Sequence, residues 1–207
     1  MFLPHDHPDR SAYTWMVKNA VVPRPIAWIG TQDAEGTGNL APFSYFTLLT
    51  MEPPTLMFSV IGNKDTHRNI LATGEFVVNL PSEGDAEAVA ASAAVLSPEI
   101  DEAAANGLLT APGISVSAPR LLDAAVALEC RFVQQIEFNA AQLVFGQITG
   151  VHVREDILDS RGRIEIGAYR PLGRLGGSLY TDVREAYRVP IPGAHEVPAA
   201  AGAPSAD

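Results

Sequence analysis

Two basic side chains stand within one short segment, Gly62–Asn69, whose residues are Gly-Asn-Lys-Asp-Thr-His-Arg-Asn. The segment runs into a predicted helix. The first amide N–H groups of a helix attract a dianion, to which a Lys or Arg adds a charge-assisted hydrogen bond. The segment therefore favours a phosphate site. The alternative is that Asp65 or Thr66 only caps the helix, which is the commoner use of such residues. The candidate phosphate ligands are Lys64, Asp65, Thr66, Arg68 and Asn69.

Hydroxyl-bearing and aromatic residues alternate along a second segment, Asn39–Thr47, which is predicted to be a strand. Such a strand can offer backbone and hydroxyl hydrogen bonds to one edge of a flat heterocycle while aromatic rings cover it. The alternative is an ordinary strand whose aromatic residues pack in the core. The candidate ring-binding residues are Asn39, Ala41, Pro42, Ser44, Tyr45, Phe46 and Thr47.

Other common catalytic patterns are missing from the sequence, which has no G-x-G-x-x-G turn, G-x-x-x-x-G-K loop or G-x-S-x-G elbow. Cys130 is the only cysteine, which excludes an internal disulfide, and it is expected to pack as a small apolar residue. His5 and His7 lie near a terminus, where a fixed ligand geometry is rare, so we expect no metal site. Redox chemistry would have to come from a cofactor.

Short strands dominate the elements that must position these residues. Strands are predicted at 24–31, 55–61, 76–80, 126–138 and 143–153, and 40–50 is expected to return beside 24–31 across a turn at 33–39. Helices are predicted at 11–21, at 66–73 and, in an alanine-rich stretch, at 85–96. Because strands and helices do not alternate regularly, an antiparallel barrel is favoured over a parallel α/β sheet.

Period-two alternation is clearest in the predicted strand 126–138. Val126, Leu128, Cys130 and Phe132 are expected on one face, and Glu129 and Arg131 on the other. Trp28, in the first predicted strand, could serve either as a core residue or as an aromatic flanking a cofactor.

The composition sets limits on class and partners. The chain has 207 residues, 47% of them hydrophobic, and a formal net charge of −10. Phosphate-rich surfaces require clustered Lys and Arg, so neither nucleic acid nor a membrane is an expected partner. The first residues lack the basic and apolar pattern of an export signal, so a cytoplasmic protein is expected. One domain is predicted over 1–189, with a disordered tail over 190–207.

A series of different short motifs lies between about Tyr13 and Tyr180. They are Pro23–Trp28, Asn39–Phe46, Pro53–Pro54, Lys64–Thr66, Arg68–Ile70, Gly74–Leu80, Asp101–Glu102, Ala118–Arg120, Leu128–Cys130, Gly146, His152, Arg174–Gly177 and Tyr180. Each motif is common, but the ordered series resembles the flavin reductase-like, FMN-binding split-barrel proteins, which are grouped with flavoredoxins and with the reductase components of two-component flavin monooxygenases. The resemblance implies a mainly β fold with peripheral helices, an antiparallel, Greek-key-like split barrel.

The resemblance also implies a cofactor and an assembly. FMN would be bound non-covalently, with its phosphate near Lys64–Asn69 and its ring edged by Asn39–Thr47. Two chains would form a homodimer with the flavins at the shared interface. The expected activity is hydride transfer from NADH or NADPH to FMN, after which reduced flavin serves a partner oxygenase or reduces a bound acceptor.

His152 is the one side chain that the resemblance would place beside both the flavin and the nicotinamide, as a catalytic residue. The alternative is a half-buried strand histidine that bonds to a neighbour. Two other functions stay open for the whole chain. One is a flavoredoxin-like electron-transfer protein without its own NAD(P)H turnover, and the other is a split barrel that has lost its flavin.

Overall fold

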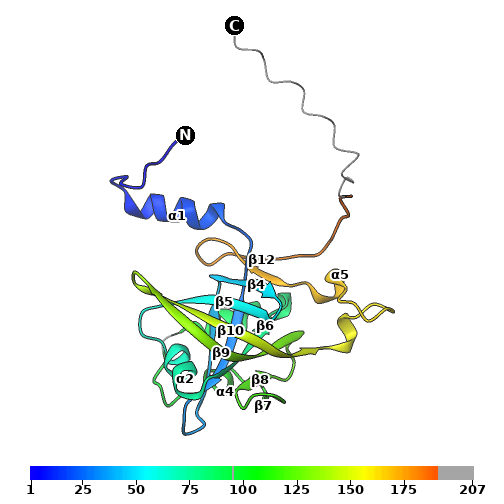
Figure 1. Ribbon diagram of the computed structural model, residues 1–207. Coiled ribbons are helices and arrows are strands. Elements are labelled where there is room, and N and C mark those ends of the chain that lie inside the picture. Colours follow the sequence, from blue (N-terminus) through cyan, green and yellow to red (C-terminus); the bar gives the residue numbers. More distant parts are fainter. Residues whose placement is uncertain (95, 191–207) are drawn as a thin grey trace.

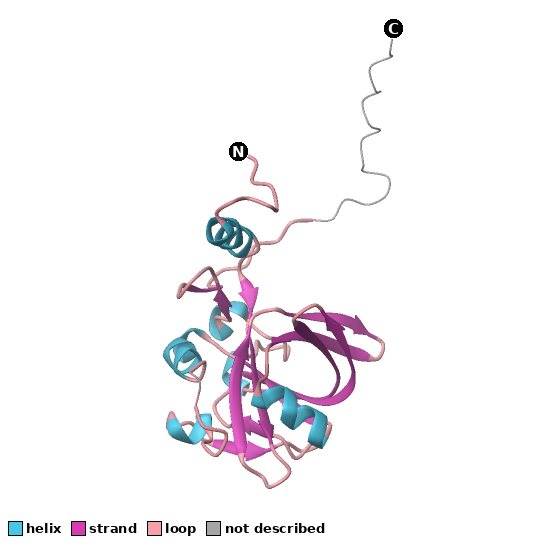
Figure 2. Cartoon of the chain, turned by 90° about the vertical axis from the view of Figure 1, so that its left-hand side faces the viewer, coloured by secondary structure: helices cyan, strands magenta, loops and turns pink. Residues whose placement is uncertain are grey.

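The computed structural model describes residues 1–94 and 96–190, and seven of its strands form one antiparallel sheet. In spatial order these strands are β3 (Gly38–Phe43), β2 (Ala27–Gln32), β6 (Glu75–Leu80), β9 (Val126–Phe138), β10 (Ala141–Val153), β5 (Pro54–Ile61) and β4 (Phe46–Met51). The sheet curls into a barrel that does not close (Figures 1 and 2). The predicted mainly β fold, an antiparallel split barrel with peripheral helices, is confirmed.

The two edges of this sheet are consecutive in the chain. β3 pairs with β2 and β4 pairs with β5, and only Ser44 and Tyr45 separate β3 from β4. At this corner the carbonyl of Tyr45 accepts a hydrogen bond of 2.9 Å from the amide of Ser59. The barrel is therefore split beside the segment that was predicted to bind a ring.

The prediction of one returning strand over 40–50 is wrong. Only Gly38–Phe43 returns beside β2, whereas Phe46–Met51 lies at the other edge of the sheet. The physical reason is that hydroxyl-bearing and aromatic residues alternate without a break through Ser44 and Tyr45, so the pattern of residue types does not show where the strand changes its partner. The other predicted strands correspond to β1 (Arg24–Pro25) with β2, and to β5, β6, β9 and β10.

The main core lies inside the barrel. As expected from the alternation in β9, the side chains of Val126, Leu128, Cys130 and Phe132 all belong to this core. Packing is close between β10 and β6, since a Cβ atom at Gly146 would lie 2.2 Å from the ring of Phe76.

A second apolar cluster covers the outer face of β2 and β3. Trp28 is its largest member, and its indole Nε1–H donates to the Ser92 hydroxyl over 2.8 Å. Trp28 is thus a core residue that also fixes the chain beyond the third helix. The covering elements are α3 (Ala86–Ala91), α4 (Glu102–Ala105) and β8 (Pro119–Leu121), with β7 (Thr110–Pro112) paired to β8.

The remaining elements lie around the barrel. A small sheet is formed by β1, β11 (Leu172–Arg174) and β12 (Tyr180–Asp182). Near it lies α5 (Ile166–Tyr169), and α1 (Arg10–Ala20) stands off the body with no buried residue (Figure 1). The short 3₁₀ turns are η1 (Glu83–Asp85) and η2 (Glu155–Ile157). None of the helices in 1–94 and 96–190 has the length and apolarity needed to cross a membrane.

Two of the predicted helices match closely and one does not. The helix predicted at 66–73 is α2 (Asp65–Thr73), which ends at Gly74 in the left-handed conformation, φ 73°. The helix predicted at 85–96 stops at Ala91, because the Ser92 hydroxyl bonds to Trp28 and to the Val89 carbonyl. The tail predicted over 190–207 lies, apart from Pro190, outside the described residues.

Candidate functional site

A cavity of about 340 Å³ lies between the edge strand β3, the start of α2 and the chain that follows α3. We call it the cofactor pocket. Seven predicted site residues line it, namely Asn39, Ala41, Pro42, Lys64, Asp65, Thr66 and Arg68. The structure therefore brings the predicted phosphate segment and the first half of the predicted ring segment to one place.

The helix end at this pocket has no side-chain cap. Lys64 is the N-cap residue in an extended conformation, and among residues 1–94 and 96–190 no side chain caps the helix start. The first bonds inside the helix run from the amides of His67 and Arg68 to the Lys64 carbonyl. The amide groups of Asp65 and Thr66 precede them and have no carbonyl within the helix to bond. The capping alternative is therefore not what the structure shows.

The two basic side chains at this end of α2 differ in whether they already have an ion-pair partner. Arg68 is paired with Asp65, with 2.6 Å between guanidinium nitrogen and carboxylate oxygen. Lys64 has no carboxylate within 4.0 Å in the described part of the chain. One ammonium group and two amide N–H groups thus remain for an anion, a donor set that suits a phosphate.

Buried hydrogen bonds lock α2 onto the barrel. The Asn39 amide donates to the hydroxyls of Thr31 and Thr66 over 3.1 and 2.9 Å, and the Asn69 amide donates to Thr31 over 3.3 Å. These side chains are nearly inaccessible to solvent. Asn69 does not line the pocket, so its observed contact holds the helix in place.

The far wall of the pocket consists of residues that the sequence motifs do not predict as ligands. This wall is formed by Ser92, Ala93, Ala94, Leu96, Pro98 and Glu102. The carboxylate of buried Glu102 accepts the amide of Leu40 over 3.0 Å, and burial raises the pKa of this carboxyl. The Asp101–Glu102 motif was noticed but given no role. Residues such as Ala93 and Ala94 offered no signal, because small apolar side chains carry no chemistry of their own.

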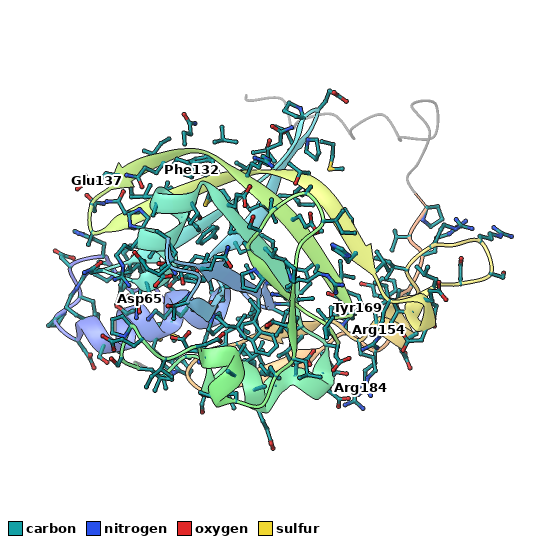
Figure 3. All side chains as sticks on the ribbon, turned by 90° about the horizontal axis from the view of Figure 1, so that it is seen from below. Asp65, Phe132, Glu137, Arg154, Tyr169 and Arg184 are labelled. Atoms are coloured by element: carbon teal, nitrogen blue, oxygen red, sulfur yellow. The ribbon has the colours of Figure 1, made fainter. Side chains whose placement is uncertain are left out.

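The second half of the predicted ring segment lies beyond this pocket. Ser44 lines an adjoining recess of about 180 Å³, which shares Pro42 and Ala93 with the cofactor pocket. Phe46 and Thr47 line a separate apolar hollow of about 350 Å³ that includes Tyr169. Seen from below, Asp65 and Tyr169 lie on opposite sides of the molecule (Figure 3). Tyr45 is at the corner between β3 and β4, near the guanidinium of Arg24.

His152 lies on β10, away from the residues that line the cofactor pocket. Its Nε2 atom is 2.5 Å from the carboxylate of buried Glu129. Burial alone would raise the pKa of Glu129, but hydrogen bonds from His152, from Ser115 and from the Ile114 amide outweigh it and lower the pKa to about 2. The contact matches the alternative interpretation, a strand histidine that bonds to a neighbour.

Comparison with known proteins places this geometry in context. The family model described as "Flavin reductase like domain" matches residues 19–172. An uncharacterized protein of Aquifex aeolicus is 38% identical over 170 residues, covering 80% of this chain and 87% of its own length.

Two solved structures are similar over almost their whole length. The 2-nitrobenzoate 2-nitroreductase of Pseudomonas fluorescens is 31% identical with a TM-score of 0.87, covering 97% of this chain and 100% of that one. Nitrilotriacetate monooxygenase component B of Bacillus cereus is 29% identical with a TM-score of 0.84, covering 91% and 98%. The extent of the family match and the shared split barrel lead to one conclusion: this chain belongs to the flavin reductase-like family.

Proposed function

We propose that the chain is an FMN-dependent reductase. FMN is held non-covalently, with its phosphate at the start of α2 and its ring along β3 towards the corner at Ser44 and Tyr45. The observation that carries this proposal is the uncapped start of α2, which faces a pocket shared with the edge strand β3. Membership of the flavin reductase-like family supports it.

Each part of the pocket has a distinct task in this proposal. Lys64 and the amides of Asp65 and Thr66 bind the phosphate. The edge strand β3, whose Leu40 amide is already bonded to Glu102, lies along the ring, and Trp28 holds Ser92 and the wall that follows it. Bound flavin would supply the hydride-accepting chemistry, so the protein's share is placement and the exclusion of competing reactions.

NADH or NADPH is the proposed hydride donor, and the electrons then have two outlets. The protein from Bacillus cereus is component B of a monooxygenase, which favours release of reduced flavin to a partner oxygenase. The enzyme from Pseudomonas fluorescens is a nitroreductase, which favours reduction of an acceptor bound beside the flavin. The two outlets differ in whether reduced flavin leaves the protein.

The assembly proposed with this function is a homodimer. Strand β4 is at the open edge of the sheet and exposes Leu48, Leu49 and Met51, of which Met51 is 71% accessible. A row of exposed apolar residues on an edge strand is a surface that proteins usually cover. A second copy of this chain would cover it and enclose the flavin between the two subunits.

Anaerobic stopped-flow absorbance tests the function directly. The purified chain is first titrated with FMN, and we expect saturable binding with a perturbed flavin spectrum. NADH or NADPH is then mixed with the loaded protein, and loss of absorbance near the oxidised flavin maximum is expected with one or both. Binding without reduction by either donor would assign the chain to the flavoredoxin-like alternative. Absence of FMN binding would contradict both flavin functions.

A further inference from the structure

The recess beside the cofactor pocket combines one guanidinium, one hydroxyl and an apolar wall. Its lining includes Ile26, Ser44, Val89, Arg174 and Tyr180, and its volume is about 180 Å³. Because it shares Pro42 and Ala93 with the cofactor pocket, a molecule in it would lie directly against whatever the pocket holds. We call it the Arg174 recess.

Arg174 lines this recess, and a second arginine, Arg24, occupies the paired position on the neighbouring strand. Arg174 of β11 lies directly opposite Arg24 of β1 in the antiparallel register. Like charges in directly opposed positions destabilise a strand pair. In the described part of the chain neither arginine has a carboxylate within 4.0 Å, although six others do: Arg68, Arg131, Arg154, Arg163, Arg170 and Arg184. Within the described residues Arg174 is therefore a cation without an ion-pair partner, which an anionic ligand would supply.

The two guanidinium groups are engaged differently. Arg24 donates to the carbonyls of Lys18, Val21 and Leu175 over 2.5, 2.9 and 2.7 Å. The Arg174 guanidinium stacks 4.4 Å from the centre of the Tyr180 ring and donates to one carbonyl, that of Gly177. A guanidinium has five N–H donors, so most of those on Arg174 remain for a ligand. The stacked ring holds this fork in one orientation.

The Ser44 hydroxyl completes the polar side of the recess. Its oxygen accepts the Nε–H of Arg24 over 3.4 Å, which leaves the O–H free to donate. The Arg174 guanidinium and the Ser44 hydroxyl therefore line the recess together with the apolar side chains of Ile26 and Val89. This arrangement suits a planar anion attached to a hydrocarbon group.

We propose that the Arg174 recess is a carboxylate subsite, which holds a small organic acid against the cofactor pocket. A guanidinium fork matches a carboxylate bidentately. The volume is below the ~300–1,000 Å³ of sites for drug-sized ligands, so it admits one small acid or the acidic end of a larger molecule. The carboxylate subsite rests on the proposed function in one respect, namely that the molecule beside the bound acid would be FMN. The phosphates of a nicotinamide dinucleotide are the other source of an anion.

Calorimetric titration of the full chain tests the subsite, both with and without FMN. Benzoate is the probe and benzamide is its uncharged analogue. We expect benzoate to bind more tightly than benzamide, and Arg174→Gln to weaken benzoate binding by roughly 10- to 100-fold while leaving benzamide unchanged. Arg174→Lys should lie between the two, because it keeps the charge and loses the fork. Arg161→Gln removes the same charge from an exposed turn and should behave as wild type.

Each contrary result has a distinct meaning. Equal affinity of the wild-type chain for benzoate and benzamide would overturn the subsite, as would an Arg174→Gln variant with unchanged benzoate binding. A raised KM for NADPH with unchanged benzoate affinity would assign the anion to the dinucleotide instead and would also overturn it. Failure of FMN to bind would contradict the proposed function but leaves the titration without FMN valid. Thermal unfolding checks that Arg174→Gln is folded, for which one cooperative transition is expected; the substitution relieves a like-charge pair and removes the contacts with Tyr180 and Gly177.

Discussion

At the scale of single residues, the ion pairs at the start of α2 determine which charged side chain is available to bind a phosphate. Asp65 neutralises Arg68, whereas Lys64 has no such partner in the described part of the chain. A phosphate at this helix end would therefore depend on Lys64 and would be repelled by Asp65. The two neighbouring residues should act on FMN binding with opposite signs.

Separate substitutions of Lys64 and Asp65 test whether the two residues have opposite effects on FMN affinity. Lys64→Ala should weaken FMN binding by about 1.5–3 kcal/mol, the range of a hydrogen bond to a charged group. Asp65→Asn should tighten binding, because it removes a negative charge next to the dianion. Fluorescence titration of both variants measures the dissociation constants. Unchanged affinity in Lys64→Ala, or weaker affinity in Asp65→Asn, would show that the phosphate lies elsewhere.

Single residues also show where reasoning from residue types falls short. Asn39, Thr66 and Asn69 were selected because their side chains can bind a ligand. The structure uses those side chains to join α2 to β2 and β3 through Thr31. A buried amide in a folded protein requires hydrogen bonds whether or not a ligand is near, so residue type alone could not separate the two uses.

At the scale of elements, one buried carboxylate fastens a loop to two strands. Glu129 of β9 accepts the amides of Ile114 and Ser115, each over 2.6 Å, as well as the Ser115 hydroxyl and His152 of β10. Its side chain is 1% exposed. Because all these groups donate to the ionised form, the carboxylate is held charged in the folded state.

The stability of the fold should depend on this carboxylate in a defined pH range. Its pKa falls from 4.5 to about 2 on folding, which corresponds to about 3 kcal/mol. A depressed pKa stabilises the folded state above pH 4.5, and the stabilisation is lost as the pH falls towards 2. In urea unfolding, Glu129→Gln should therefore be less stable than wild type by up to that amount at pH 7, and by less at pH 3.

The matched control for this experiment is Glu137→Gln, at the exposed far end of the same strand. Its free energy of unfolding should stay close to that of wild type at both pH values. If Glu129→Gln lost equal stability at pH 7 and pH 3, the effect would come from packing and not from ionisation.

At the scale of the whole molecule, the edge strand β4 of the open barrel exposes apolar side chains to solvent. Leu49 of β4 belongs to the exposed apolar row. Leu109 is an exposed leucine that directly precedes β7, a strand that Figure 1 shows far from β4. Burying the row in a dimer would remove apolar surface from water on both copies.

Charging the two leucines separately tests the homodimer. The wild-type chain should have close to twice the mass of one 22.0 kDa chain in size-exclusion chromatography with light scattering. Leu49→Glu should shift it towards the monomer and weaken FMN binding, because the flavin is proposed to lie between subunits. Leu109→Glu should change neither. A wild-type chain that elutes as a monomer would contradict the assembly.

By itself the sequence determined the type of fold and the position of most long elements. Alternation placed β9 at its observed bounds, Gly74 marked the end of α2, and the ordered motifs predicted the split barrel. The first two features depend on residues close together in the chain, where periodicity and turn chemistry act directly.

Only the tertiary structure decided how those elements meet. It separated β3 from β4 at a corner, brought Glu102 beneath Leu40, placed the chain after α3 against α2, and opposed Arg24 to Arg174. Such contacts join residues far apart in the chain, and the hydrophobic burial that drives them is not directional. A pattern of residue types can therefore show that a side chain is able to bind, while the packing of distant strands decides what it faces.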